Sequence, residues 1–182
     1  MSVLVIDLEK LRSGSHRCSG EIDPSELRLA DPSALGFDGK LELDIRISTT
    51  DSLSYHVHGD ISYRVKTECR RCLRPVSANR NVEVRGMYSF AEGLERLELS
   101  EEERELQGIL PLAADSDCID LTDLVRESVV LDYPRFLLCS EDCRGLCPGC
   151  GADLNEETCR CSSQAVDPRW SKLIDLKKEN NN

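Results

Sequence analysis

Cysteine is the residue type in this sequence whose spacing suggests chemistry. Ten cysteines occur in 182 residues, and eight of them fall into clusters. The clustered thiols are Cys69, Cys72, Cys139, Cys143, Cys147, Cys150, Cys159 and Cys161. A Cys-x-x-Cys pair presents two sulfurs to one metal ion from a tight turn, and two pairs complete the tetrahedron of a structural zinc site. Eight clustered thiols therefore predict two zinc ions, with no coordination position left for a catalytic water.

Loop lengths favour one partition of these thiols. Cys147, Cys150, Cys159 and Cys161 follow one another closely, so closing a site among them costs little chain entropy. That leaves Cys139 and Cys143 to share the other metal with the distant pair Cys69 and Cys72. An interleaved arrangement, in which the distant pair shares a metal with Cys147 and Cys150, stays open as the alternative.

Two other interpretations of the thiols compete with metal binding. Cys147-Pro-Gly-Cys150 resembles a disulfide-exchange motif, but such motifs lie at the start of a helix that follows a strand. Gly151 after the second cysteine, and the further pair at 159 and 161, instead favour a metal-binding turn. Simple burial of apolar thiols does not explain the spacing, and we expect it only for the isolated Cys18 and Cys118.

Arginines surround both groups of thiols. They are Arg70, Arg71, Arg74, Arg144 and Arg160. Four thiolates around one Zn²⁺ carry two net negative charges, so these arginines could simply neutralise the metal sites. They could equally face the phosphates of RNA, because metal-binding loops can display arginine rigidly. The spacing alone leaves both interpretations open.

Composition limits the possible functions further. Asp and Glu outnumber Lys and Arg by 34 to 23, giving a net charge of −11, and aromatic residues make up 4%. Any nucleic-acid contact must therefore use a local basic patch. Phosphate-binding loops, nucleophile elbows and HExxH motifs do not occur, so we expect no enzyme and no small-molecule substrate. The start of the chain lacks signal-peptide character and no apolar run reaches membrane-spanning length, which predicts a cytoplasmic protein away from membranes.

The predicted fold class is α+β: an antiparallel β-meander covered by one or two helices, with a C-terminal cysteine-rich zinc-knuckle module. Apolar and polar residues alternate over 41–47, 53–65 and 82–90, the pattern of strands with one buried face. Asp120 precedes a helix-period segment that ends before Pro134, so a covering helix is expected at about 121–132. The acid-rich segment 92–105 is predicted to be a solvated loop or a short exposed helix.

The expected domain organisation follows from these elements. Residues 1–134 form the β-rich domain, 135–165 the cysteine-rich module, 166–178 a C-terminal helix with Pro168 at its first position, and 179–182 a disordered tail. In this arrangement the first zinc ion ties the cysteine-rich module to the strands that flank Cys69 and Cys72.

Four motifs in this order resemble the YceD-like family of bacterial and plastid proteins. They are Cys69-x-Arg71-Cys72-Leu73, Ile119-Asp120-Leu121-x-x-Leu124-Val125-x-Glu127, Cys143-x-Gly145-Leu146-Cys147-Pro148-x-Cys150-Gly151-x-x-Leu154-Asn155, and Asp167-Pro168-Arg169-Trp170-x-x-Leu173. The resemblance implies a role in accumulation of 23S ribosomal RNA and in assembly of the large ribosomal subunit. The expected partner is then 23S rRNA or a precursor of the large subunit. Two alternatives remain: an adaptor that binds a ribosomal protein or assembly factor through segment 92–105, and a thiol redox protein using Cys147 and Cys150.

Overall fold

The computed structural model describes residues 3–12, 14–29, 35–159 and 161, and divides the chain into two compact units. The first unit comprises Met1–Thr67 with Pro75–Leu137, and the second comprises Glu68–Arg74 with Leu138–Asn182. The turn that carries Cys69 and Cys72 therefore belongs to the second unit. The predicted helix at 166–178 and the predicted tail at 179–182 lie outside the described residues.

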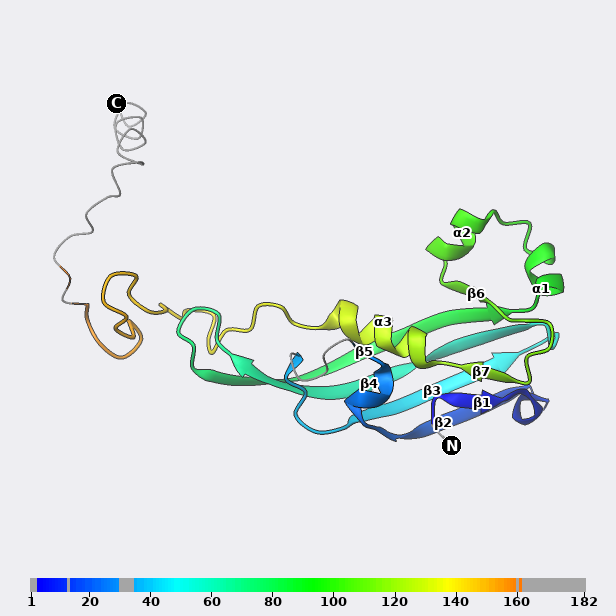
Figure 1. The fold of residues 1–182 in the computed structure, drawn as a ribbon, viewed down its shortest axis with the longest axis horizontal. Coiled ribbons are helices and arrows are strands. Elements are labelled where there is room, and N and C mark those ends of the chain that lie inside the picture. Colours follow the sequence, from blue (N-terminus) through cyan, green and yellow to red (C-terminus); the bar gives the residue numbers. More distant parts are fainter. Residues whose placement is uncertain (1–2, 13, 30–34, 160, 162–182) are drawn as a thin grey trace, which may run out of the picture. The chain divides into compact units, whose positions relative to one another are not determined.

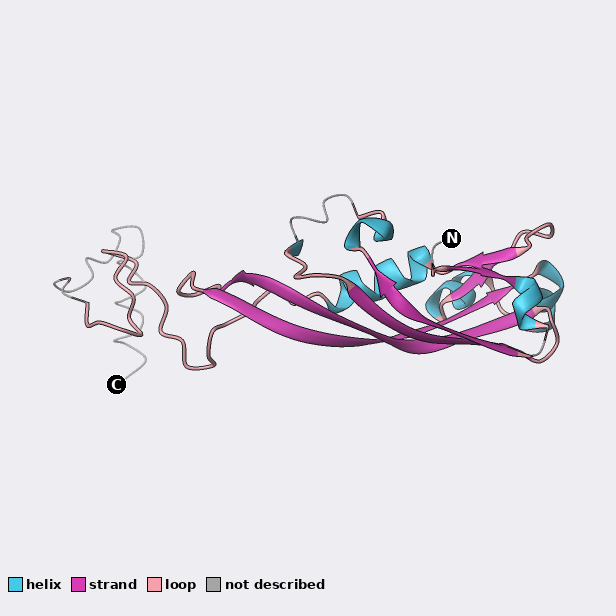
Figure 2. Cartoon of the chain, turned by 90° about the horizontal axis from the view of Figure 1, so that it is seen from below, coloured by secondary structure: helices cyan, strands magenta, loops and turns pink. Residues whose placement is uncertain are grey.

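A five-stranded sheet forms the centre of the first unit (Figures 1 and 2). Its strands, in spatial order, are β2 (Ser15–Ile22), β3 (Leu41–Thr49), β4 (Ser54–Glu68), β5 (Pro75–Ser89) and β6 (Ile109–Pro111). β2 pairs with β3 and β3 with β4 in antiparallel fashion, whereas the short β6 runs parallel to β5. The predicted α+β class with an antiparallel sheet is confirmed, and β2 and β6 are strands that the alternation pattern did not reveal.

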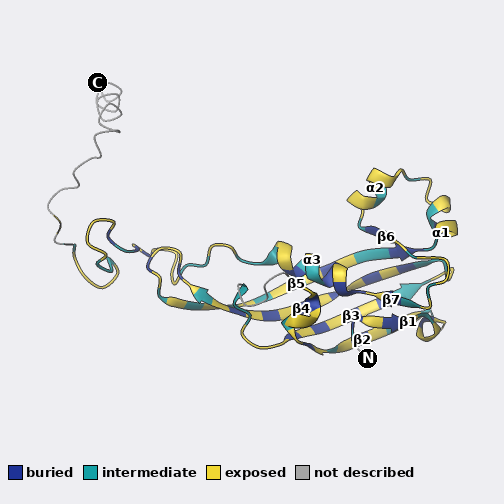
Figure 3. Cartoon of the chain, viewed as in Figure 1, coloured by how far each residue is buried: buried dark blue, intermediate teal, exposed yellow. Residues whose placement is uncertain are grey.

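The strands bury one face because their apolar residues alternate with polar ones. In β3, the side chains of Leu41, Leu43, Ile45 and Ile47 are all buried, and the intervening residues are exposed. β4 continues the same pattern over nearly its whole length, visible in Figure 3 as alternating dark blue and yellow segments. Since successive side chains of a strand point to opposite faces, one face of this sheet is dry and the other is solvated.

A second layer covers the dry face. It consists of the antiparallel pair β1 (Val5–Asp7) and β7 (Cys118–Asp120), the short 3-10 helices η1 (Leu8–Leu11) and η2 (Pro24–Leu27), and α3 (Thr122–Asp132). Figure 2 shows α3 lying along one side of the sheet. Val125 and Val129 of this helix, and Leu121 just before it, are fully buried. The helix begins one residue later than predicted, because Asp120 ends β7 while its carboxylate accepts the main-chain N–H of Thr122 at 2.9 Å.

The acid-rich segment forms two short helices, α1 (Ala91–Arg96) and α2 (Glu101–Leu106). α2 begins with a capping box in which the side chain of Ser100 and that of Glu103 each accept a main-chain N–H of the other residue. Acidic residues fill the first turn of α2, where the positive end of the helix dipole stabilises them. No helix in the described part of the chain is long and apolar enough to cross a membrane.

Loops and turns make up most of the described part of the second unit. A single antiparallel bridge joins Leu146 to Asp153. The buried cluster of this unit consists of Cys69, Cys72 and Cys143, with Leu138 and Leu146 packed against it. Sulfur therefore occupies the position that aliphatic side chains fill in the first unit.

Candidate metal centres

The first candidate centre joins a turn at the end of β4 to a loop about seventy residues later in the sequence. Its sulfurs belong to Cys69, Cys72, Cys139 and Cys143, and all four lie within 4.8 Å of one another. The Sγ atoms of Cys69 and Cys143 are 3.7 Å apart, and those of Cys72 and Cys139 are 3.5 Å apart. A tetrahedron with Zn–S bonds of about 2.3 Å has sulfur–sulfur edges of about 3.8 Å, so this group has the size of a zinc site.

The second candidate centre is local in sequence. The Sγ atoms of Cys147, Cys150, Cys159 and Cys161 also lie within 4.8 Å of one another. Cys147 is 3.2 Å from Cys159 and 4.0 Å from Cys161, and Cys150 is 3.7 Å from Cys159, measured between sulfurs. The thiols thus meet in the two sets that loop length favours, and the sulfurs of Cys69 and Cys72 group with Cys139 and Cys143.

The two Cys-x-x-Cys turns are built alike. The main-chain N–H of Leu73 donates to the carbonyl of Cys69 at 2.9 Å, and that of Gly151 donates to the carbonyl of Cys147, also at 2.9 Å. Leu73 and Gly151 both take the left-handed conformation, with φ of 61° and 74°. Glycine adopts this backbone without cost, as the sequence predicts for Gly151, whereas in the first turn a leucine adopts it.

Each set of thiols also favours a cation electrostatically. The main-chain N–H of Cys72 is the main cause that lowers the pKa of the Cys69 thiol to about 6, and that of Cys150 does the same for Cys147, also to about 6. In the same clusters, neighbouring thiols raise the pKa of Cys139 and of Cys161 to about 12. One sulfur of each set therefore ionises readily while another resists, because negative charge accumulates without a counterion. A divalent cation that binds thiolate removes this conflict.

Two of the predicted arginines make specific contacts inside the second unit. The Nε of Arg74 donates to the carboxylate of Asp153 at 2.7 Å, and its Nη1 lies 3.1 Å from that of Glu156. Arg71 donates from Nη1 to the carbonyl of Cys143 at 2.8 Å. These guanidinium groups hold loops together, a role that their spacing in the sequence did not reveal.

The other three arginines near the cysteines are Arg70, Arg144 and Arg160. Arg70 and Arg144 are exposed, and Arg160 lies outside the described residues.

The sequence patterns did not indicate the acidic partners of Arg74 on the loop between Cys150 and Cys159, nor a role for Asn155. Their signal is the run of Asp, Asn and Glu in a short loop, which is typical of turns closed by side chains.

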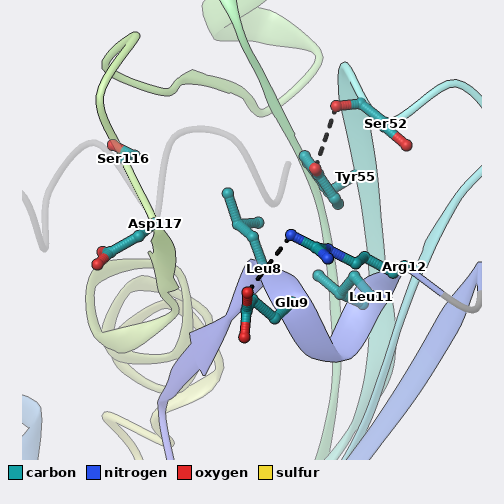
Figure 4. A pocket seen from close by; sticks show the side chains of 8 residues that line it. All are labelled: Leu8, Glu9, Leu11, Arg12, Ser52, Tyr55, Ser116 and Asp117. Carbon is teal, nitrogen blue, oxygen red and sulfur yellow. Dashed lines mark hydrogen bonds and ion pairs between the residues drawn. The ribbon is translucent and has the colours of Figure 1, made fainter.

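The first unit carries a pocket of a different kind. A pocket of about 400 Å³ is shown in Figure 4, lined by Leu8, Glu9, Leu11, Arg12, Ser52, Tyr55, Ser116 and Asp117. Arg12 pairs with Glu9 at 3.4 Å, and the hydroxyl of Tyr55 donates to the carbonyl of Ser52 at 3.1 Å. Four of the polar residues in this lining thus pair among themselves.

The two isolated cysteines lie in different strands, Cys18 buried in β2 and Cys118 half-buried in β7.

Comparison with known families identifies the chain's relatives. The family described as large ribosomal RNA subunit accumulation protein YceD matches residues 57–177, which is 121 of the 182 residues. The chain belongs to the YceD family. The matched part of this YceD protein starts in β4 and contains α3 and all eight clustered cysteines.

Individual relatives match different lengths of the chain. An uncharacterized protein of Mycobacterium tuberculosis is 31% identical over 136 residues, covering 75% of this chain and 61% of the relative. A protein of Mycobacterium leprae is 26% identical over 136 residues, covering 75% of this chain and 58% of the relative. The chain thus spans about three fifths of the length of these mycobacterial relatives. A chloroplastic protein of Arabidopsis thaliana, named large ribosomal RNA subunit accumulation protein YCED homolog 1, is 31% identical over 61 residues, covering 34% of this chain and 19% of that protein. No solved structure matches the chain.

Proposed function

We propose that this protein is a non-enzymatic, zinc-stabilised factor that supports accumulation of 23S rRNA and biogenesis of the large ribosomal subunit. The match to the YceD family over residues 57–177 carries the ribosomal part of this proposal. The proposed site of action is the cytoplasm, where thiols stay reduced and available to metal.

Two zinc ions would complete the second unit, one in each four-cysteine cluster. Sulfur–sulfur distances of 3.2 to 4.0 Å fit a tetrahedral thiolate site. With four thiolates per ion, the coordination shell is closed, so zinc would supply stability to the fold and no activated water. The eight cysteines are the ligands that we propose.

The proposed RNA contacts are those of Arg70, Arg71, Arg74, Arg144 and Arg160. Arg71 and Arg74 also hold loops of the second unit together, so replacing them would disturb the fold as well as any phosphate contact. Arg70 and Arg144 are exposed in loops next to the cysteine ligands, where a metal site would hold them in place. Arginine in a rigid loop is suited to phosphate, because its planar fork can bind two oxygens at once.

Two alternative functions would use other residues of the chain. The acidic α2 could bind a basic ribosomal protein or an assembly factor, since Glu101, Glu102 and Glu105 are exposed. Disulfide exchange by Cys147 and Cys150 has less support, because this pair lies in a turn surrounded by two further thiols rather than at the start of a helix. The experiment below separates the first alternative from direct RNA contact.

The test is complementation of a strain that lacks the gene, with 23S rRNA accumulation and co-sedimentation with large-subunit precursors as readouts. Arg70→Glu combined with Arg144→Glu should reduce co-sedimentation and 23S rRNA while two zinc ions remain bound. The matched control is Arg12→Glu with Arg96→Glu, which changes the net charge equally at exposed positions of the first unit. Association through phosphates should also weaken steeply as salt rises.

Other outcomes would redirect or reject the proposal. Loss of co-sedimentation on replacing Glu101, Glu102 and Glu105 by Lys, with the arginine variant unaffected, would favour the protein-binding adaptor. Unchanged 23S rRNA in the strain that lacks the gene would reject the ribosomal role. Freely reactive Cys147 in metal-loaded protein would reject zinc binding in the second cluster.

A further inference from the structure

The loop between Cys150 and Cys159 contacts both candidate metal centres. Cys150 and Cys159 belong to the second cluster, so the loop closes that site. Within the loop, Asn155 lies with its side-chain Nδ2 3.5 Å from the Sγ of Cys143, which belongs to the first cluster. A residue of the second site's loop thus donates a hydrogen bond to a sulfur of the first site.

Both ends of the Asn155 side-chain amide are hydrogen-bonded. Its Oδ1 accepts the main-chain N–H of Arg144 at 2.7 Å, and Nδ2 also donates to the carboxylate of Asp153 at 2.7 Å. An amide nitrogen has two donor hydrogens, so Asp153 and the sulfur of Cys143 use both of them. This network fixes the direction in which Asn155 points.

A second connection runs from a residue beside the first site to the loop of the second site. Arg74 follows the Cys69–Cys72 turn of the first site, and its guanidinium pairs with Asp153 and Glu156 of the same loop. The side chain of Asp153 is only 20% exposed, so this pair is better shielded than an ordinary surface ion pair. Main-chain bonds add to the connection, with Leu146 donating to the carbonyl of Arg71 at 3.0 Å and Leu154 to that of Gly145 at 2.9 Å.

We propose that the two four-cysteine sites bind metal cooperatively, because the Asn155 loop that the second site closes supplies a positioning hydrogen bond to Cys143 of the first. This inference rests on the proposed zinc binding. A metal in the second site fixes the ends of the loop, which holds Asn155 against Cys143. Groups that hydrogen-bond to metal ligands orient them and adjust their affinity. By thermodynamic reciprocity, a metal in the first site strengthens the second by the same factor.

The coupling is measurable as a cycle of variants in the full chain under reducing conditions. Cadmium, which binds thiolate in place of zinc, gives each site its own ¹¹³Cd resonance, and a competing chelator reports the affinity of the first site. Disabling the second site by Cys159→Ser with Cys161→Ser should weaken the first site on the order of 10-fold. In an Asn155→Ala background the same disabling should have a clearly smaller further effect, because the hydrogen bond to Cys143 is already gone and only the Arg74 and main-chain contacts remain.

Two further variants compare loss of the Asn155 donor groups with an unrelated charge change in the same loop. Asn155→Asp keeps an oxygen that can accept from Arg144 but loses both N–H donors, to Cys143 and to Asp153, so the resonance of the first site should move and its affinity should fall. Glu157→Gln is the matched control on the same loop, since Glu157 is exposed, and it should leave both resonances and affinities unchanged.

Each result has a definite meaning. If wild-type protein binds two metal ions but the first site is equally tight with and without the second, cooperative binding is refuted while the zinc proposal stands. If Asn155→Asp behaves as wild type, the hydrogen bond to Cys143 is not the connection. If the wild-type protein binds no metal, both the zinc proposal and this inference fail.

Discussion

Gly145 lies where the loop after Cys143 passes close to the main chain of Arg71. Its φ is +74°, and a Cβ placed there would be 3.0 Å from the carbonyl oxygen of Arg71 and 3.2 Å from its Cβ. Gly151 has the same φ of +74°, but a Cβ at that position would meet nothing within 4 Å. Comparing the two glycines therefore distinguishes the cost of the left-handed backbone from the cost of a close contact.

We predict that Gly145→Ala destabilises the second unit more than Gly151→Ala. Both substitutions cost roughly 1–2 kcal/mol for the left-handed conformation. Gly145→Ala adds steric overlap with a backbone atom, which in packed sites costs a further 1–3 kcal/mol or so. The measurement is the rate at which metal-loaded protein transfers zinc to a chromophoric chelator. Equal rates for the two variants would show that the loop at Gly145 can move away from Arg71 without an energetic cost.

The elements of the first unit depend on contacts at their ends as well as on the buried face. Asp132 is the last residue of α3, where the negative end of the helix dipole disfavours a carboxylate. It is held there by the Nε of Arg80 at 3.0 Å, from β5, and by the hydroxyl of Tyr63 at 2.7 Å, from β4. These partners fasten the end of the covering helix to two strands of the sheet.

We predict that Asp132→Asn lowers the free energy of unfolding by about 1 kcal/mol near neutral pH, the worth of a partly exposed charge-assisted hydrogen bond. The hydrogen bond from Arg80 is the main cause that lowers the pKa of Asp132 below its ordinary 3.8. A depressed carboxylate pKa contributes stability above the unfolded pKa and loses it as pH falls through the folded value. The difference between wild type and variant should therefore be constant near neutral pH and shrink below about pH 4.

Urea unfolding followed by circular dichroism at several pH values measures this difference. Asp123→Asn is the control in the first turn of the same helix, where Asp123 pairs with Arg126 while 61% exposed. An exposed pair of this kind contributes little, so the control should cost less than Asp132→Asn. A difference between wild type and Asp132→Asn that persists unchanged in acid would exclude the ionised carboxylate as its source.

At the scale of the whole molecule, the two units are stabilised by different means. The first buries an aliphatic cluster that includes Leu41, Ile45, Ile61 and Val125. The buried cluster of the second is made of Cys69, Cys72 and Cys143, with two partly buried leucines. Small modules whose interior is sulfur depend on metal for their folding free energy, because loops alone bury too little apolar surface.

We predict that removing metal with a chelator under reducing conditions unfolds the second unit and leaves the first folded. Hydrogen exchange should become fast in 68–74 and 138–159, while the amides of β3 and β4 up to Val65 stay protected. Returning zinc should restore protection in the second unit. Loss of protection throughout β3 would show that the sheet also needs the metal, and unchanged exchange everywhere would show that the second unit is stable without it.

Sequence patterns predicted the features that depend on near neighbours. Alternation over 41–47 and 53–65 predicted β3 and β4, since period two is a local property of a half-buried strand. The helical stripe of Leu121, Leu124, Val125 and Val129 predicted α3 in the same way. Thiol spacing and loop length suggested which sulfurs would meet, because the second cluster closes within a short loop.

Other features have weak local signals. β2 carries only Cys18 and Ile22 as buried residues among polar ones and glycine, so it forms through pairing with β3 rather than through its own pattern. The helix α2 lacks an apolar stripe, and its local signal is the capping box of Ser100 and Glu103. β2 was therefore missing from the predicted strands, whereas a short exposed helix was one of the two structures predicted for segment 92–105, which contains most of α2.

Amino-acid sequence by itself determined the α+β class, the strands with one dry face, the covering helix and the two groups of thiols. Only the tertiary structure decided what the arginines and Asn155 contact. Arg74 meets Asp153 across 79 positions of the chain. Asn155 meets Cys143 where its loop approaches the loop after Cys143, with Leu154 donating to the carbonyl of Gly145. Periodicity and ligand spacing are encoded by adjacent residues, whereas the partner of a charged or amide side chain depends on which distant segments the fold brings together.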